Sequence, residues 1–248
     1  TRLHVAEPVW APVSAELLVA RQPDADEALV QAELASLIGA FLDPLTGGSD
    51  GTGWPFGRDV YASELYELLG RVPSLDYVAD ILLTSSCAGV DQRRCAEAVP
   101  VWNDDGDQLG LGLAAHHLPL AALDPAAIVV ARELVRGRVA VAVTPAPGVS
   151  PTAARTAVKT ALRAVFHPRQ PPLYTRGPTG QGAWDIGADT LRATVQALPE
   201  VATVSSLTLD GDPDRAGRLP VVVRSGRSYF QVGERQLADV RTTVEIVS

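Results

Sequence analysis

Closely spaced aspartates are the first residues in this sequence that could do chemistry. There are two groups of three: Asp104, Asp105 and Asp107, and Asp210, Asp212 and Asp214. Carboxylate oxygens at such spacing are the ligands that Ca²⁺ prefers. Neither group has the glycine and the more distant glutamate of an EF-hand loop, and Asp-Gly pairs are common at the tips of β-hairpins. We therefore favour Asp-Gly turns over a metal site.

Three other carboxylates could serve as the paired acids of a glycoside hydrolase, which needs one acid and one base or nucleophile on either side of the scissile bond. They are Asp59, Glu64 and Glu67. They fall on a predicted helix whose other positions are ordinary, without the aromatic cleft that sugar binding favours, so we assign them to a solvated helix face. No nucleophile stands beside a base and an orienting group, and we predict a chain that is not an enzyme and binds no cofactor.

The histidines and cysteines offer little more. His116 and His117 form the only pair among four histidines. Adjacent residues of a strand point to opposite faces, so this pair is predicted to mark a strand end and not to chelate a metal. Cys87 and Cys95 lie in a polar loop and are either two reduced surface thiols or a local disulfide. A zinc site is not expected, because no histidine lies at ligand spacing from them.

Composition excludes several classes of partner. The 248 residues carry a formal net charge of −8, and 46% of them are hydrophobic. No basic stripe is present that could neutralise phosphates, so nucleic-acid binding is not expected. The longest apolar run, residues 126–131, is far shorter than the ~20 residues that cross a bilayer. The chain lacks methionine and residues 1–11 lack the plan of a signal peptide, so we expect a part of a longer polypeptide.

Two long segments of the chain resemble each other. Residues 16–44 and residues 139–168 both read as an aliphatic strand, a turn with proline, an amphipathic helix that closes on phenylalanine, and a further proline. Phe41 corresponds to Phe166. Each helix has an apolar stripe at three- and four-residue spacing. The first stripe is Leu29, Val30, Leu34, Leu37, Ile38 and Phe41; the second is Ala154, Ala157, Val158, Ala161, Leu162, Val165 and Phe166.

The helix starts follow from capping chemistry. Ser150 is a good N-cap and Pro151 suits the first helical position, where its missing N–H costs nothing. In the first copy, Asp24 or Asp26 is the cap. Each helix is predicted to end near a proline, because the residue before proline disfavours helix.

The similarity extends through a second helix. Trp54 matches Trp184 and Gly57 matches Gly187, both at an offset of 130 positions, whereas Pro73 matches Pro199 at an offset of 126. The first copy is therefore predicted to carry four extra residues, about one helical turn, in its second helix. Alternating strands follow at residues 77–83 and 202–209.

A hairpin is predicted to complete each copy. Residues 99–102 turn at 103–106 and return through 109–116, and residues 221–224 turn at 225–227 and return through 229–232. The predicted fold class is α+β, a tandem duplication of a small module of strand, helix, helix, strand and hairpin. The predicted domains are residues 1–124 and 125–248.

The stretch FLDPLTGGSDGTGWPFGRDVYASELYELLGRVPSLDYV, residues 41–78, resembles the "putative baseplate assembly protein" family. These are the baseplate J-like wedge proteins of contractile phage tails and of extracellular contractile injection systems. The opening TRLHVAEPVWAPVSAELLV is also similar to the segment that precedes it in such proteins, and GQGAWDIGADT in the second half is a weaker version of the motif.

The resemblance implies a C-terminal portion of a structural wedge protein without catalytic residues or cofactors. Implied partners are other wedge, hub and sheath-proximal proteins in a hetero-oligomer with sixfold ring symmetry. Implied localisation is cytoplasmic assembly, followed by incorporation into a tail or tail-like particle that is released. The alternative is a tandem binding or hydrolytic module of a cell-surface-acting protein, which predicts a concave pocket with converging polar groups.

The interface candidates come from the glycine-rich loop and its weaker second copy: Trp54, Phe56, Gly57, Arg58 and Trp184. Tryptophan and phenylalanine supply large rigid surfaces that anchor either a packed loop or a partner. Trp54 and Phe56 therefore either fill the core of their own module or contact another subunit. Glycines in the same loop allow positive φ and close backbone approach.

Overall fold

A computed structural model describes residues 7–91, 93–132, 134–166, 175–176, 183–210, 221–224, 227–233 and 237–247. The chain forms two compact units. Residues up to 101 together with 108–130 make up unit 1, and residues 102–107 together with those from 131 onward make up unit 2. Helices and strands alternate in both units and the sheets are mixed, which confirms the predicted α+β class.

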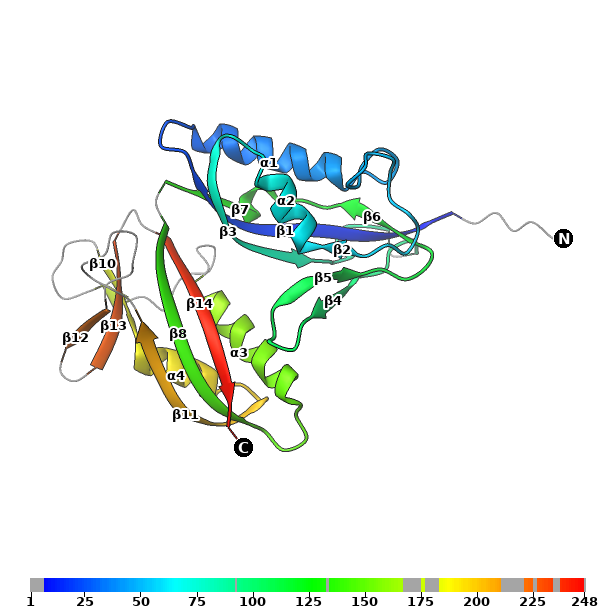
Figure 1. Cartoon of the computed structure of the whole chain (residues 1–248). Helices are drawn as coiled ribbons and strands as arrows, with labels where there is room; N and C mark the ends of the chain where they lie inside the picture. Colours follow the sequence, from blue (N-terminus) through cyan, green and yellow to red (C-terminus); the bar gives the residue numbers. More distant parts are fainter. Residues whose placement is uncertain are drawn as a thin grey trace. The chain divides into compact units, whose positions relative to one another are not determined.

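Unit 1 contains two α-helices and a run of strands. In chain order the elements are β1 (Val9–Arg21), α1 (Glu27–Phe41), β2 (Val60–Tyr61), α2 (Ala62–Leu69), β3 (Leu75–Thr84), β4 (Val99–Trp102), β5 (Gln108–Gly112), β6 (His117–Ala121), the 3₁₀ turn η1 (Pro125–Ala127) and β7 (Ile128–Ala131) (Figure 1). Strand β1 pairs antiparallel with β3 and parallel with β6, and β7 also pairs with β1. A smaller sheet has the order β2-β5-β4.

Helix α1 begins as its capping chemistry predicts. The Asp26 carboxylate accepts hydrogen bonds from the backbone N–H groups of Ala28 and Leu29, both at 3.0 Å, so Asp26 and not Asp24 is the cap. The buried residues of the helix recur at the predicted spacing: Val30, Leu34, Ile38 and Phe41. The predicted burial of Leu29 as part of the apolar stripe is wrong, because this residue is 72% exposed. It lies one position outside the arc that faces the sheet.

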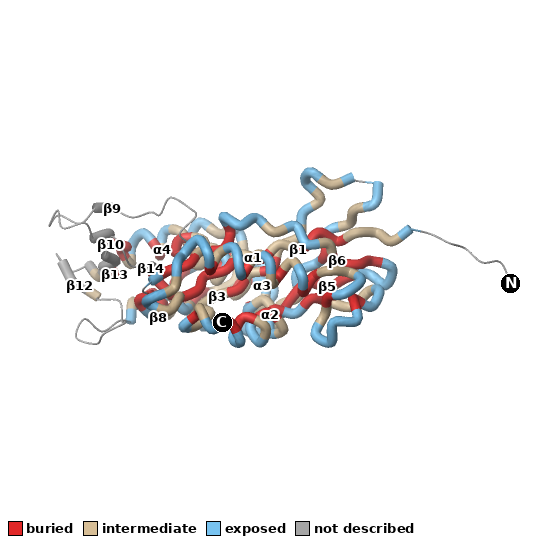
Figure 2. The backbone as a smooth tube through the Cα atoms, turned by 90° about the horizontal axis from the view of Figure 1, so that it is seen from above, coloured by how far each residue is buried: buried red, intermediate tan, exposed pale blue. Residues whose placement is uncertain are grey.

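The core of unit 1 lies between its main sheet and its helices. Alternate residues of β1 are fully buried, namely Val13, Ala15, Leu17 and Val19. They form one cluster with the buried faces of α1 and α2, and Figure 2 shows the buried stretches of these elements in red. The connection between α1 and β2 joins two elements that pack around this core.

Unit 2 also contains two α-helices among its described elements, with strands before, between and after them. The elements are β8 (Leu134–Pro145), α3 (Pro151–Phe166), β9 (Thr175–Arg176), β10 (Ala183–Gly187), α4 (Ala188–Gln196), β11 (Val201–Asp210), β12 (Val221–Arg224), β13 (Arg227–Gly233) and β14 (Leu237–Ile246). Strand β8 pairs antiparallel with β11 and parallel with β14. A second sheet, of four strands, has the order β12-β13-β10-β9.

Helix α3 follows its predicted chemistry. The Ser150 hydroxyl accepts a hydrogen bond from the Ala153 N–H at 3.1 Å, and Pro151 is the first residue of the helix. Val158 and Leu162 are fully buried, and Phe166 contacts the ring of Phe230 edge-on with the ring centroids 6.2 Å apart. The helix thereby closes the core of its unit.

Several details of the predicted repeat are wrong. Helix α2 has 8 residues and α4 has 9, so the four extra residues of the first copy do not lie in its second helix. The N-caps of these helices are Tyr61 and Gly187, an offset of 126 positions, and Gly57 therefore does not correspond to Gly187. Trp54 lies in the connection before β2 whereas Trp184 lies inside β10.

Other predictions hold at the level of secondary structure. Phe41 and Phe166 are the last residues of α1 and α3, and Pro73 and Pro199 each stand two positions before the next strand. The strands predicted at 77–83 and 202–209 lie within β3 and β11. The returning strand predicted at 109–116 ends earlier, at Gly112, and the parallel partners β6 and β14 were not predicted.

The predicted hairpin turns are described in part. The turn after β4 is confirmed, because the Asn103 N–H donates to the Asp107 carbonyl at 2.9 Å and the Gly106 N–H donates to the Asn103 carbonyl at 3.1 Å. Asp210 is the last residue of β11, and Asp212 and Asp214 lie outside the described residues.

Candidate interaction surface

The connection between α1 and β2 begins with a carboxylate that organises the backbone. Asp43 accepts hydrogen bonds from the N–H groups of Leu45 and Thr46 at 2.9 and 2.7 Å, and from the Thr46 hydroxyl at 2.9 Å. These donors, the Thr46 N–H first, hold the pKa of the Asp43 carboxyl below its usual range. The charged carboxylate therefore shapes the first turn of the loop.

Two glycines let the loop fold back on the end of α1. A Cβ on Gly47 would lie 2.2 Å from the Phe41 carbonyl oxygen, and one on Gly53, where φ is +92°, would lie 2.7 Å from the Pro44 oxygen. Only glycine fits such contacts. The Trp54 N–H then donates to the Pro44 carbonyl at 3.1 Å, which closes the loop at its base.

Trp54 is a core residue. Its side chain is 5% exposed, its Nε1–H donates to the Phe41 carbonyl at 2.9 Å, and its ring meets the Phe41 ring edge-on with the centroids 5.6 Å apart. The indole N–H satisfies a carbonyl at the C-terminus of α1 that has no partner within the helix. Of the two alternatives left open by the sequence, Trp54 therefore takes the core.

Arg58 joins the loop to α2. Its guanidinium carbon lies 4.6 Å from the centroid of the Trp54 ring, and the same group forms an ion pair with Glu64. Glu64 also accepts a hydrogen bond from the Tyr61 N–H at 3.3 Å. Glu64 is thus a structural partner with a mostly buried side chain, and its predicted place on a solvated face is wrong.

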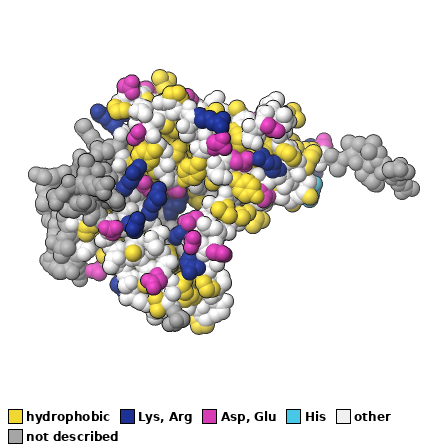
Figure 3. Space-filling view, in the orientation of Figure 1, with side chains coloured by type: hydrophobic (Ala, Val, Ile, Leu, Met, Phe, Trp, Pro, Cys, Tyr) yellow, Lys and Arg dark blue, Asp and Glu magenta, His cyan; other side chains and the backbone are white. Residues whose placement is uncertain are grey.

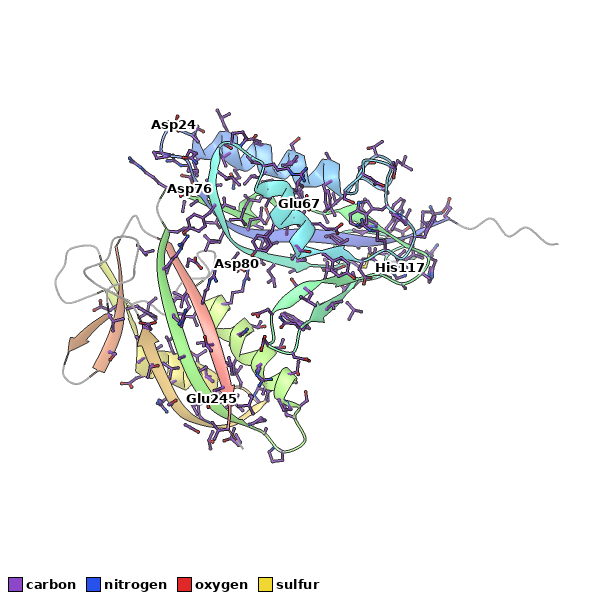
Figure 4. All side chains as sticks on the ribbon, viewed as in Figure 1. Asp24, Glu67, Asp76, Asp80, His117 and Glu245 are labelled. Atoms are coloured by element: carbon purple, nitrogen blue, oxygen red, sulfur yellow. A yellow bond between two sulfur atoms is a disulfide. The ribbon has the colours of Figure 1, made fainter. Side chains whose placement is uncertain are left out.

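The other two candidate acids have separate roles. Asp59 accepts a hydrogen bond from the Leu113 N–H at 2.9 Å and lies before β2, outside the helix. Glu67 is on α2, as Figure 4 shows, and forms an exposed ion pair with Arg71. The three carboxylates therefore each hold a different local contact.

Gly57 anchors the far end of the loop. Its φ is +70°, its N–H donates to the His117 carbonyl at 3.0 Å, and a Cβ at this position would lie 2.6 Å from the Ala115 Cα. The glycine is required by close packing against the turn before β6. Its role in an interface stays a prediction.

Phe56 is the loop residue that meets solvent through a large ring. It is 60% exposed, although Trp54 before it is buried and Gly57 after it is fixed against β6. Leu45, at the start of the same loop, is 80% exposed. Figure 3 shows that hydrophobic side chains also gather over β4 and β5, where Val99 and Leu109 are exposed. Unit 1 thus has exposed apolar side chains on the loop before β2 and around β4 and β5.

Trp184, the fifth candidate, is the second residue of β10. Its Cα faces Val232 of β13 and Arg176 of β9 in the strand register. Its side chain lies outside the described residues, and its role in an interface stays a prediction.

Cys87 and Cys95 form a disulfide. Of the two alternatives that the sequence left open, the structure has the local disulfide and not two reduced thiols. The sequence does not predict its neighbours: the backbone of Cys95 forms an isolated β-bridge with Trp10 at the start of β1, far away in the sequence. Nothing in the spacing of the two cysteines could have revealed that contact.

The two histidines lie closer together than the strand argument implied. His117 is the first residue of β6, but His116 stands in the preceding turn, and their rings meet edge to face with centroids 4.6 Å apart. Burial, with a smaller effect of His116, lowers the pKa of His117. Figure 4 shows His117 beside the beginning of β1. Within the described ranges, no group of three or more His, Cys, Asp or Glu side chains could hold a metal ion.

Comparisons with models of protein families, with curated proteins and with solved structures find no match for this chain. Among the described residues, no helix is both long and apolar enough to cross a membrane. The functional interpretation therefore rests on the resemblance of residues 41–78 and on the geometry of the loop.

Proposed function

We propose that this chain is a structural component of the baseplate wedge of a contractile phage tail or injection system, and that Phe56 contacts a neighbouring subunit. The observation that carries the proposal is the exposure of Phe56, 60%, on a loop whose other large ring, Trp54, is buried. The stretch that resembles the baseplate family, residues 41–78, includes this whole loop, α2 and the start of β3.

The rigidity of the loop favours binding. A loop that is already ordered loses little conformational entropy when a partner covers it, so more of the burial energy appears as affinity. Asp43, the close-packed glycines and the Trp54 indole supply that order before any partner arrives. A phenylalanine buried in an interface removes its ring from water, and aromatic anchors of this kind dominate interface energetics.

The partners in this proposal are other wedge, hub and sheath-proximal proteins arranged with sixfold symmetry. The chain has no catalytic role and no cofactor, and assembly takes place in the cytoplasm before the particle is released. Size-exclusion chromatography with light scattering of the native assembly that copurifies with the full-length protein tests this directly. We expect a large ring-shaped complex; a discrete monomer that hydrolyses a polysaccharide would instead support the tandem binding or hydrolytic module.

We also infer that the two units descend from one duplicated module. The support is the similar order of elements and the common pairing: the first strand of each unit pairs antiparallel with the long strand after the second helix, β3 or β11, and parallel with a strand that follows the hairpin, β6 or β14. The strand before the second helix pairs with the return strand of the hairpin in both, Val60 with Leu111 and Ile186 with Phe230. The repeat then aligns at the offset of 126 that Tyr61 and Gly187 define.

An experimental structure of the chain tests the duplication. Superposition of the two units on β1 and β8 is expected to place Phe41 on Phe166 and Pro73 on Pro199, with Trp54 away from Trp184. A superposition that matches the helices in a different order would contradict a common origin.

A further inference from the structure

The loop closed by the Cys87–Cys95 disulfide contacts the beginning of β1. The Trp10 N–H donates to the Arg94 carbonyl at 2.8 Å, and the Ala96 N–H donates to the Trp10 carbonyl at 3.0 Å, so Cys95 forms a parallel bridge with Trp10. Arg94 also forms an ion pair with Glu7. Residues 94–96 therefore act as a short strand beside the first residues of the main sheet.

This short strand pairs with a part of β1 that the described register with β3 does not reach. The register of β1 with β3 begins at Ser14 and Thr84, so β3 has no partner residue for Trp10. On its other edge, β1 pairs with β6 from Val9 to Val13. Successive residues of a strand direct their backbone groups to alternate edges, and the Trp10 groups point to residues 94–96. Segment 94–96 thus continues the edge that β3 leaves at Thr84.

The loop has few other supports. The Cys87 N–H donates to the Glu97 carboxylate at 3.0 Å and the Ala98 N–H donates to the Ser85 hydroxyl at 2.9 Å, and both acceptors lie just outside the closed loop, in the same connection between β3 and β4. Most of the loop's described residues are exposed or half-buried. The disulfide is the only covalent tie across the loop, and it joins residues on either side of the turn at 88–94.

We propose that the Cys87–Cys95 disulfide is a redox-controlled clamp on the start of β1. In the oxidised chain, residues 94–96 are held against Trp10. In the reduced chain, the loop detaches and the backbone N–H and C=O of Trp10 open to solvent or to an incoming strand. An unpaired strand edge is a ready template for pairing with another chain.

An ordinary thiol can reduce the Cys87–Cys95 disulfide in a balanced reaction. Two molecules of R–SH reduce the disulfide through a mixed disulfide, and the products are the Cys87 and Cys95 thiols and R–S–S–R. Two electrons and two protons pass to the protein. The half-buried cysteines leave the sulfurs within reach of a small thiol. An oxidised thiol compound reverses the reaction, so a chain made in a reducing compartment closes the clamp when the surroundings become oxidising.

Hydrogen exchange on the full chain with and without dithiothreitol tests the proposal. Thiol counting first establishes that both cysteines are disulfide-bonded without reductant and free with it. Reduction is expected to raise the exchange rates of the Trp10 and Ala96 amides at least tenfold, while amides of α1 and of the β1 segment paired with β3 stay unchanged. The disulfide restricts the detached state of the loop, so its loss is expected to favour detachment even though the closed loop is short.

Variants separate the clamp from general destabilisation. In the double variant Cys87→Ser with Cys95→Ser, the Trp10 and Ala96 amides are expected to exchange as fast as in the reduced parent. Their exchange rates are expected not to change with dithiothreitol. Glu97→Gln, which alters a contact at the base of the loop but keeps the disulfide, is expected to retain the response to dithiothreitol. Unchanged protection of Trp10 and Ala96 after complete reduction would overturn the proposal, and so would two free thiols in the protein purified in air.

Discussion

Arg58 stacks over the indole ring of Trp54, with its guanidinium carbon 4.6 Å from the ring centroid, and extends to Glu64 on α2. This contact links the loop that follows α1 to the next helix. Arg58→Ala removes the stacking and the ion pair together and is expected to lower the free energy of unfolding of unit 1 by about 1 kcal/mol. Because the arginine side chain is 31% exposed, solvent screens part of the ion pair.

Urea unfolding checks this expectation. Arg58→Lys is the matched control, since it keeps the charge but loses the planar group that stacks on the ring. It is expected to fall between the parent and Arg58→Ala. Equal stability of the parent and the alanine variant would show that the contact contributes nothing measurable.

Gly57→Ala tests the close approach of the loop to the turn before β6. The new methyl group would lie 2.6 Å from the Ala115 Cα, at a position where φ is +70°. Gly89→Ala provides the control, because φ there is +81° but nothing lies within 4 Å of the added carbon. Both changes cost about 1 kcal/mol for the backbone conformation, and Gly57→Ala is expected to cost clearly more. Similar thermal shifts for the two variants would contradict the contact.

His117 makes the stability of unit 1 depend on pH. Its folded-state pKa lies below the ordinary value of 6.5, because burial disfavours the imidazolium. The unfolded chain therefore binds the proton more readily, and this contribution to stability is full above pH 6.5 and is lost as the pH falls below 6.5 toward the folded pKa. Between pH 7 and pH 5 the parent is expected to lose more stability than His117→Gln does.

His116→Gln is the control for this measurement, since His116 is exposed. Its stability is expected to follow the parent's pH profile closely. If His117→Gln retains the parent's full loss of stability, the buried imidazole is not its source.

Phe41 and Phe166 close the cores of their units at the ends of α1 and α3. They are 7% and 5% exposed, and each meets another aromatic ring. Truncation of either to alanine is expected to cost roughly 3–5 kcal/mol through lost burial and a residual cavity. Calorimetry of Leu29→Ala, at a residue that is 72% exposed, supplies the comparison. A Phe41→Ala chain that melts within a degree of the parent would contradict the assignment.

Local chemistry was enough to predict the helices. The cap at Ser150, the choice of Asp24 or Asp26 as the other cap, the apolar spacing of α1 and α3 and the strands β3 and β11 all follow from residues near one another in the chain. The boundary of a buried face is harder to predict, as Leu29 shows. An apolar residue at the edge of a helical stripe is buried only if the sheet extends far enough to cover it.

Long-range pairing explains most of what was missed. The parallel strands β6 and β14 pair with β1 and β8 from the far end of each unit, and no local pattern distinguishes a parallel partner from a loop. The sequence comparison matches Trp54 with Trp184 at an offset of 130 positions, whereas the second helices begin at Ala62 and Ala188, 126 positions apart. The contact of Cys95 with Trp10 likewise depends on tertiary structure alone.

The sequence could not show which of the two aromatic side chains of the loop is buried in the core. Trp54 and Phe56 are two positions apart, and each could have filled the core. The structure buries Trp54, whose indole N–H donates to the Phe41 carbonyl, a hydrogen bond that phenylalanine could not make. Phe56 is left at the surface.

The incorporation of a Phe56→Ser chain into baseplates tests the central claim most directly. Particles would be assembled with the parent, with Phe56→Ser or with the control Leu29→Ser, and the chain would be quantified per particle. Since Phe56 and Leu29 are both exposed, neither change is expected to alter the melting temperature by more than a few degrees. We expect Phe56→Ser to reduce incorporation at least tenfold, while Leu29→Ser assembles normally. Normal incorporation of a folded Phe56→Ser chain would contradict the proposed contact.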